Sequence, residues 1–218
     1  MNQILNQQKS IIKQTKSSKK STKATFFKAQ FVFSILLILA IIVTFFISIQ
    51  RQNSNEFTAH QISSNYNISK LYNNENSQIN NLYNQNGESF TIIGIIEIPK
   101  IGIYYPIISE SNDELLKISP CRISGPMPNE DGNLCIAGHN YDNYKFFSKL
   151  VDLDINDKII IYDLKSNSLS YNISEVYEVK ADDLSPLSIN KGIKKQVTLI
   201  TCNNLKSDNR IIIKASAK

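Results

Sequence analysis

Three side chains in the second half of the chain have the types needed for nucleophilic acyl transfer. They are a thiol, Cys202, an imidazole, His139, and a guanidinium, Arg210. A thiolate attacks a carbonyl carbon, an imidazole passes a proton to the leaving amine, and a fixed cation stabilises the oxyanion. A cation beside a thiol also makes the thiolate easier to form. The three residues therefore predict chemistry through a thioester, provided that the fold brings them together.

Two β-branched runs place two of these residues opposite each other. The runs cover 196–202 and 210–213, and the segment between them is rich in turn-forming residues. Such a pattern predicts two antiparallel strands joined by a loop, so Cys202 and Arg210 should face each other across the mouth of that loop. His139 ends a third predicted strand, 133–139, and we expect it to lie near the same place.

The rest of the folded part also reads as short strands separated by turns. About eight strands and little helix favour a closed barrel or a sandwich, a mainly β fold. The expected strands, besides those above, are 92–98 and 101–107 with a kink at Pro99 and Gly102, 158–163, 168–174 and 176–180. The segment 112–118 suits a helical turn, 120–132 a loop, 143–150 a short helix, and 182–195 a loop or helical turn.

Charge is distributed unevenly along the chain. The net charge is +5, but residues 1–50 hold seven lysines and no acidic residue, so the remainder carries 17 basic against 19 acidic side chains. The basic excess therefore belongs to a short N-terminal tail and does not indicate a nucleic-acid partner.

An uncharged run, Ala29–Ile49, follows this tail and contains only four polar side chains. A helix of that length spans about 30 Å, the hydrocarbon thickness of a bilayer. A signal peptide has a shorter apolar region followed by small residues, whereas this run ends at Gln50-Arg51, so we expect an uncleaved anchor. Lysines before the run place the N-terminus in the cytoplasm and the rest outside the cell.

The sequence thus predicts four parts of a single-pass cell-membrane protein. They are a cytoplasmic basic tail (1–28), a transmembrane anchor (29–49), an extracellular spacer (50–88) and an extracellular folded domain (89–218). The spacer holds 11 asparagines and no sustained apolar period, which is typical of an unstructured linker. Its histidine, His60, has no scaffold around it, so His139 is the histidine that the domain can use.

The three cysteines leave several interpretations open. Cys121 and Cys135 could form a disulfide or act as small buried hydrophobes, and an odd count leaves at least one thiol unpaired within the chain. Together with His139 the cysteines could be read as zinc ligands, but they lack the closely spaced pairs of structural zinc sites. We expect no metal and no cofactor.

At these residues the sequence resembles the sortases, cysteine transpeptidases of Gram-positive cell surfaces. Residues 198–202 (Thr-Leu-Ile-Thr-Cys) match the family's TLxTC signature, Ala137-Gly138-His139 resembles the segment with its catalytic histidine, and Arg210 falls where its essential arginine would. The resemblance covers roughly residues 92–215, and an N-terminal anchor with a spacer also suits the family.

The resemblance implies an eight-stranded sortase β-barrel that cleaves an LPXTG-type C-terminal sorting signal between Thr and Gly. Cys202 would be the nucleophile, His139 the general acid and base, and Arg210 the oxyanion-stabilising or positioning cation, with Thr201 in contact with the substrate. The acyl group would pass to an amine of a cell-wall precursor such as lipid II, anchoring a surface protein. Class A and class D both remain open. Some class A members bind calcium through acidic loops, but we expect Asp182 and Asp183 to be merely solvated.

Two other interpretations compete with this one. A membrane-anchored binding module with a degenerate barrel would carry its thiol without using it. A cysteine-dependent peptidoglycan L,D-transpeptidase would need a glycine-rich motif leading into the cysteine, whereas Cys202 follows Thr198-Leu199-Ile200-Thr201.

Overall fold

The computed structural model describes residues 26–28, 30–51, 82–83, 89–141, 145–165, 167–203 and 208–217. The chain divides into two compact units, Met1–Arg51 and Gln52–Lys218. Of the predicted tail and spacer, only 26–28, 50–51 and 82–83 are among the described residues. The expectation of an unstructured linker therefore falls, for the rest of the spacer, outside the described residues.

In its described part, the first unit contains the helix Phe26–Arg51, of 26 residues. By length and apolar composition this helix could cross a membrane, since it spans about 39 Å. Its large apolar side chains are exposed within the structure. The predicted anchor, 29–49, lies inside this helix, which begins at Phe26.

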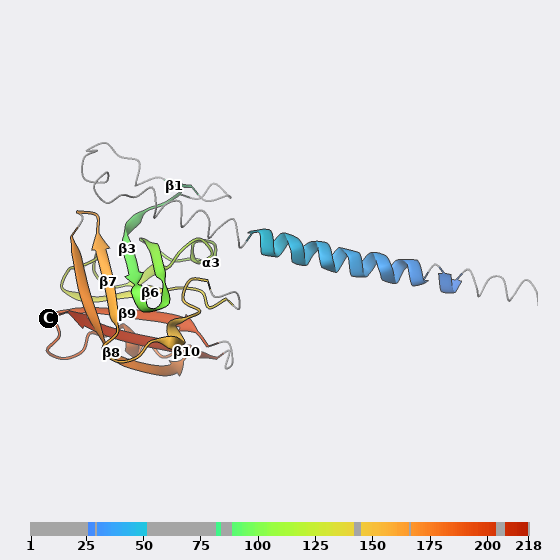
Figure 1. Ribbon diagram of the computed structural model, residues 1–218. Coiled ribbons are helices and arrows are strands. Elements are labelled where there is room, and N and C mark those ends of the chain that lie inside the picture. Colours follow the sequence, from blue (N-terminus) through green and yellow to red (C-terminus); the bar gives the residue numbers. More distant parts are fainter. Residues whose placement is uncertain are drawn as a thin grey trace, which may run out of the picture. The chain divides into compact units, whose positions relative to one another are not determined.

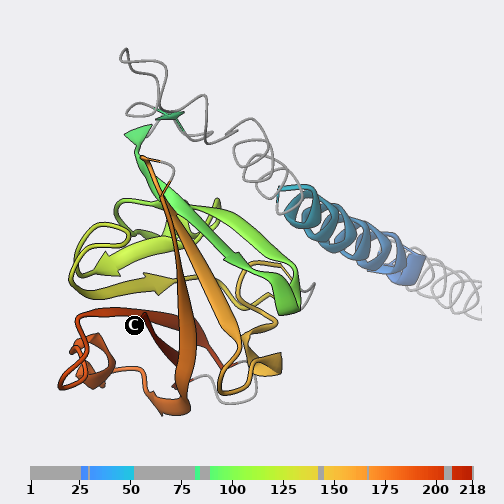
Figure 2. The ribbon, with the colours of Figure 1, turned by 60° about the vertical axis from the view of Figure 1, so that its left-hand side comes forward.

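The second unit is built around a closed barrel of eight strands (Figures 1 and 2). Around the barrel the order is β10-β8-β7-β3-β4-β5-β6-β9. The strands are β3 (Ile92–Ile98), β4 (Ile103–Ile108), β5 (Cys121–Ser124), β6 (Gly132–Ala137), β7 (Lys158–Asp163), β8 (Ser168–Lys180), β9 (Lys195–Cys202) and β10 (Asn209–Ala217). Short helical turns join them: η1 (Pro99–Ile101), α3 (Asp113–Leu116), η2 (Leu150–Asp152) and η3 (Ser185–Leu187). The predicted mainly β barrel is therefore confirmed.

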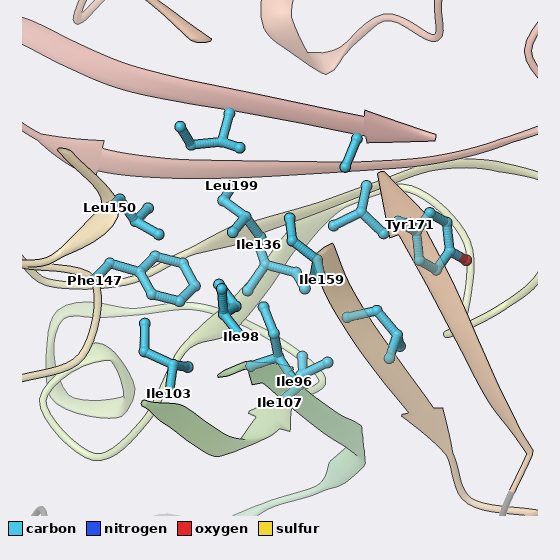
Figure 3. Close-up of a cluster of buried hydrophobic side chains, with 14 of the residues drawn as sticks. Ile96, Ile98, Ile103, Ile107, Ile136, Phe147, Leu150, Ile159, Tyr171 and Leu199 are labelled. Carbon is cyan, nitrogen blue, oxygen red and sulfur yellow. The ribbon is translucent and has the colours of Figure 1, made fainter. Parts of the chain in front are cut away.

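The interior is filled by isoleucine-rich faces of these strands. Residues of β3, β4, β6, β7, β8, β9 and β10 contribute to one cluster, and most of them are almost fully buried (Figure 3). Alternation along a strand sends one face inward, so on β9 Val197 and Leu199 lie in the core while Cys202 belongs to the other face. Phe147 and Leu150, which follow β6, close the same core.

Several local predictions were wrong. Residues 121–124 form β5 rather than part of a loop, and the strands expected at 168–174 and 176–180 are one strand, β8, with a register shift opposite Lys214 and Ala215. The helix expected at 143–150 is absent from its described part, 145–150, where Phe146 has a φ of 51° and pairs with Asn140. Inside the predicted spacer, β1 (Leu82–Tyr83) pairs with β2 (Ser89–Phe90).

Candidate active site

β9 has a parallel neighbour, β6, on one side and an antiparallel neighbour, β10, on the other. In the antiparallel pair Cys202 lies directly opposite Arg210, as predicted. Residues directly opposite in a sheet project to the same face, so the thiol and the guanidinium share a face at the end of the barrel. Cys202 is exposed, which leaves its thiol accessible to a substrate.

The parallel pair brings His139 to the same end. Ala137 pairs with Ile200, and the ladder continues for one residue because the Gly138 amide donates to the Ile200 carbonyl at 3.1 Å. His139 is two residues beyond Ala137, and Cys202 is two residues beyond Ile200. His139 therefore lies just past the end of β6 and level with Cys202 at the end of β9, so the fold brings together all three residues predicted to be catalytic.

Two side-chain hydrogen bonds lock these strand ends together. The buried Thr201 hydroxyl donates to the Gly138 carbonyl at 2.7 Å, and the Asn140 amide donates to the Cys202 carbonyl at 2.7 Å. Each bond joins a neighbour of His139 to the segment that carries Cys202. In the structure the Thr201 hydroxyl bonds to the protein itself, and its predicted contact with substrate stays a prediction.

An aromatic stack supports the imidazole of His139. Its ring centroid lies 4.9 Å from that of Tyr141, with 33° between the planes. Tyr141 in turn packs on Phe146 at 5.8 Å, and Phe146 packs on Tyr105 at 5.2 Å. Because Tyr105 and Phe146 are core residues, the stack links the orientation of the imidazole to the packed interior.

Close packing beneath His139 explains the glycine before it. A Cβ atom on Gly138 would lie 2.7 Å from the Phe147 ring, which is fully buried. The Phe147 amide also donates to the His139 carbonyl at 3.0 Å. Residue 138 must therefore be small for the histidine segment to lie against the core.

The electrostatic surroundings of His139 favour the neutral imidazole. Burial lowers the pKa of His139 from 6.5, the nearby Lys117 lowers it further, and Asp113 acts in the opposite direction. Its Nε2 atom is buried and has no hydrogen-bond partner among the residues that the structure describes. A neutral imidazole can accept a proton at a ring nitrogen, and the imidazolium so formed can deliver one.

The other two cysteines are free thiols buried away from solvent, so no disulfide joins them. Burial raises the pKa of Cys121 to about 12 and that of Cys135 to about 11. Thiols of this kind are poor nucleophiles at neutral pH, which matches their predicted role as small hydrophobes. Within the described ranges no group of three His, Cys, Asp or Glu side chains could hold a metal ion.

A buried polar network holds the segment between β8 and β9 on the outer face of the barrel. The Asn133 amide donates to the carbonyls of Pro186 and Leu187, both at 3.1 Å. Lys214, only 4% exposed, donates to the Ser188 carbonyl at 3.0 Å and to Asn190 Oδ1 at 2.9 Å. This segment therefore has a defined position above β6, β9 and β10.

Sequence reasoning missed two polar residues at the site. Asn140, described above, follows His139 directly. Glu178 of β8 accepts hydrogen bonds from Asn203 and Asn209, which flank the Cys202–Arg210 pair. The position of Asn140 beside the histidine was a usable signal, whereas nothing local in the sequence marks Glu178.

Comparison with known proteins agrees with this geometry. A sequence model of the sortase domain matches residues 96–218. Sortase A of Streptococcus agalactiae is 26% identical over 210 residues, covering 85% of this chain and 84% of that protein. Sortase A of Staphylococcus aureus is 27% identical over 117 residues, 52% of this chain, and the match spans only 56% of that protein.

Solved structures give the same result. A Clostridium perfringens sortase D5 transpeptidase superimposes with a TM-score of 0.53 at 32% identity, covering 59% of this chain and 79% of that one. Sortase C1 of Streptococcus agalactiae gives a TM-score of 0.53 at 26% identity, covering 58% of this chain and 67% of that one. With the family model matching more than half of its length and the barrel shared with these structures, the chain belongs to the sortase family.

Proposed function

We propose that this chain is a membrane-anchored sortase that cleaves an LPXTG-type sorting signal between Thr and Gly. The observation that carries the proposal is the register at the barrel end, where Cys202 pairs with Arg210 and stands level with His139. An exposed thiol between an imidazole and a guanidinium suits attack on a peptide carbonyl and fits a family of transpeptidases.

The first half-reaction makes a thioester. The Cys202 sulfur attacks the Thr carbonyl, and the Arg210 guanidinium stabilises the oxyanion. The Thr–Gly bond then breaks, and the imidazolium of His139 gives its proton to the departing Gly amine. Because burial lowers the pKa of His139, only a minor share of molecules carries the imidazolium at neutral pH. We expect a bell-shaped pH dependence of the acylation rate.

The second half-reaction transfers the acyl group. His139, now neutral, removes a proton from an incoming amine, which attacks the thioester and releases the Cys202 thiolate. A cell-wall precursor amine of the lipid II type is the proposed acceptor, and surface proteins with a C-terminal sorting signal are the proposed substrates. Thr201 is proposed to contact the substrate through its backbone, since its side chain is turned to Gly138.

The proposed setting follows from the arrangement of the chain. Residues 1–28 would be cytoplasmic, 29–49 would cross the membrane, 50–88 would act as a spacer, and 89–218 would be the extracellular catalytic domain. The long apolar helix Phe26–Arg51 supports a single-pass anchor. Seven lysines before the apolar run and only Arg51 directly after it support this orientation.

The test is covalent capture with the full chain in detergent micelles. An LPXTG-type peptide should give an adduct by intact mass that is absent in Cys202→Ala and is discharged by triglycine. An adduct that survives in Cys202→Ala would move the nucleophile elsewhere. If a panel of related motifs gives no adduct, the proposed cleavage is overturned, in favour of either a sortase of unusual specificity or a non-catalytic binding module.

A further inference from the structure

The residues on either side of the Cys202–Arg210 pair form one more rung of the same strand ladder. Asn203 follows the cysteine and Asn209 precedes the arginine. The Asn203 backbone amide donates to the Asn209 carbonyl at 3.1 Å, so this rung closes the mouth of the β9–β10 hairpin. Strand ends fray more readily than strand centres, and both catalytic residues lie next to this end.

One carboxylate joins both residues of that rung. By alternation Asn203 and Asn209 project to the face opposite Cys202 and Arg210. There the Asn203 amide donates to Glu178 Oε1 at 2.8 Å, and the Asn209 amide donates to Glu178 Oε2 at 3.0 Å. Asn203 is only 8% exposed, whereas Glu178 is exposed, so the first bond is partly buried and the second lies in solvent.

Glu178 reaches this rung from a third strand. It pairs with Ile211 across the β8–β10 ladder, while β9 lies on the other side of β10. The carboxylate thus ties β9 to β8 over the end of β10, and hydrogen bonds to a charged acceptor are stronger than those between neutral groups. Movement of the mouth would change the separation of the thiol and the guanidinium on the opposite face.

We propose that Glu178 is a positioning residue: its carboxylate holds Asn203 and Asn209 so that Cys202 and Arg210 stay at a fixed separation. This inference rests on the proposed function, because it assigns that separation a catalytic purpose. Glu178 contacts neither the substrate nor the thiol in this role, and it acts through the two asparagines.

The experiment compares Glu178→Ala and Glu178→Gln with the unchanged full chain in detergent micelles. The first readout is the rate of Cys202 alkylation by iodoacetamide between pH 6 and pH 10, which needs no substrate. Glu178→Ala should let the cation move away from the thiol, so Cys202 should react more slowly in this variant than in the unchanged chain. The second readout is acylation by an LPXTG-type peptide, where kcat should fall about tenfold or more with KM nearly unchanged.

Glu178→Gln separates a hydrogen-bonding role from a charge role. Its amide oxygen can accept from one asparagine, and its amide nitrogen can donate to the other once that asparagine turns its own amide over. Glu178→Gln should therefore retain most of the alkylation rate and most of the acylation rate of the unchanged chain. Glu175→Gln is the matched control for alkylation, because Glu175 lies on the same strand and accepts from Asn190, away from the mouth. That variant should alkylate like the unchanged chain.

Coupling to the asparagines completes the test. If Glu178 acts through Asn203, the loss in Glu178→Ala plus Asn203→Ala should be no larger than in Asn203→Ala alone. Full additivity would overturn the proposal, as would a Gln variant as slow as the Ala variant or an Ala variant with unchanged alkylation. A chain that forms no peptide adduct would contradict the proposed function, while the alkylation rates would still decide the role of Glu178.

Discussion

Arg210 and Arg122 are the two arginines of the barrel unit, and their surroundings predict opposite effects of replacement. Arg122 Nε donates to the Ser109 carbonyl at 3.0 Å and its Nη1 to the Gly125 carbonyl at 3.1 Å, so it fastens loops together. Arg122→Ala should cost about 1–3 kcal/mol of stability and leave acylation intact. Arg210→Ala should slow acylation by about 100-fold or more with little change in Tm. Single-turnover acylation and thermal denaturation measure the two effects, and equal losses of rate would contradict the assignment.

Asn140 allows a second prediction at the scale of one residue. Its amide donates to the Cys202 carbonyl at 2.7 Å. Asn140→Ala should lower stability by about 0.5–1.5 kcal/mol and slow acylation, because the ends of β6 and β9 lose one tie. Asn140→Asp should be worse, since a carboxylate facing a carbonyl oxygen has no proton to donate.

The control for Asn140 is Asn172→Ala, which changes an exposed asparagine on β8. Acylation rates and urea denaturation should not differ between this control and the unchanged chain. A rate in Asn140→Ala equal to that of the control would remove the positioning role.

At the scale of an element, α3 and the residue after it set the charge around the imidazole. Lys117 lowers the pKa of His139, and Asp113 raises it. Lys117→Ala should therefore raise the His139 pKa, and Asp113→Asn should lower it further. NMR titration of the imidazole measures this, with a His60→Gln background to leave one histidine signal, since the chain has only two. Shifts of the opposite sign would contradict the geometry.

The same pKa has a consequence for stability. In the folded chain the His139 pKa is below 6.5, so the folded state binds fewer protons than the unfolded state between the two values. The contribution of this residue is fully present above 6.5 and declines as the pH falls through the lowered pKa.

The sequence predicted best the strands whose pairing partners are close to them along the chain. The β9–β10 hairpin follows from two adjacent apolar runs with turn formers between them, and its register follows from alternation. β5 was missed because its pairing is non-local: Cys121 meets Ile108 in parallel and Ala137 in antiparallel register. The inward and outward alternation of side chains along β8 changes at a β-bulge, but the strand continues past it. From the sequence alone this change of alternation suggested two separate strands.

The three residues proposed to be catalytic and their supporting residues also differ in how far the sequence could predict them. Residue type, rarity and strand ends indicated Cys202, His139 and Arg210. Glu178 could not be found in this way, because it contacts Asn203 across the intervening strand β10. Only the folded barrel creates that contact. The helix expected at 143–150 failed because Phe146 and Phe147 both turn into the core, which the backbone achieves with a positive φ at Phe146.

At the scale of the whole molecule, the barrel closes on itself within the second unit, Gln52–Lys218. Residues 52–218 alone should therefore fold, with a Tm within a few degrees of the full chain and the same rate of Cys202 alkylation. Differential scanning calorimetry and alkylation kinetics test this. A large loss of Tm would show that Met1–Arg51 contributes to the folding of the barrel.

The three cysteine thiols lie in different surroundings, so their reactivity can report which part of the molecule has opened. Cys202 is exposed, Cys121 lies in a small core cluster with Phe90 and Leu115, and the Cys135 sulfur lies 3.9 Å from the Leu187 carbonyl. A brief pulse of alkylating agent should label one thiol in the closed molecule. Cys135 should be labelled when the segment between β8 and β9 moves away from β6. Cys121 should be labelled only when the core cluster beside β5 opens. The number of labels, counted by intact mass, would thus distinguish local opening from global unfolding.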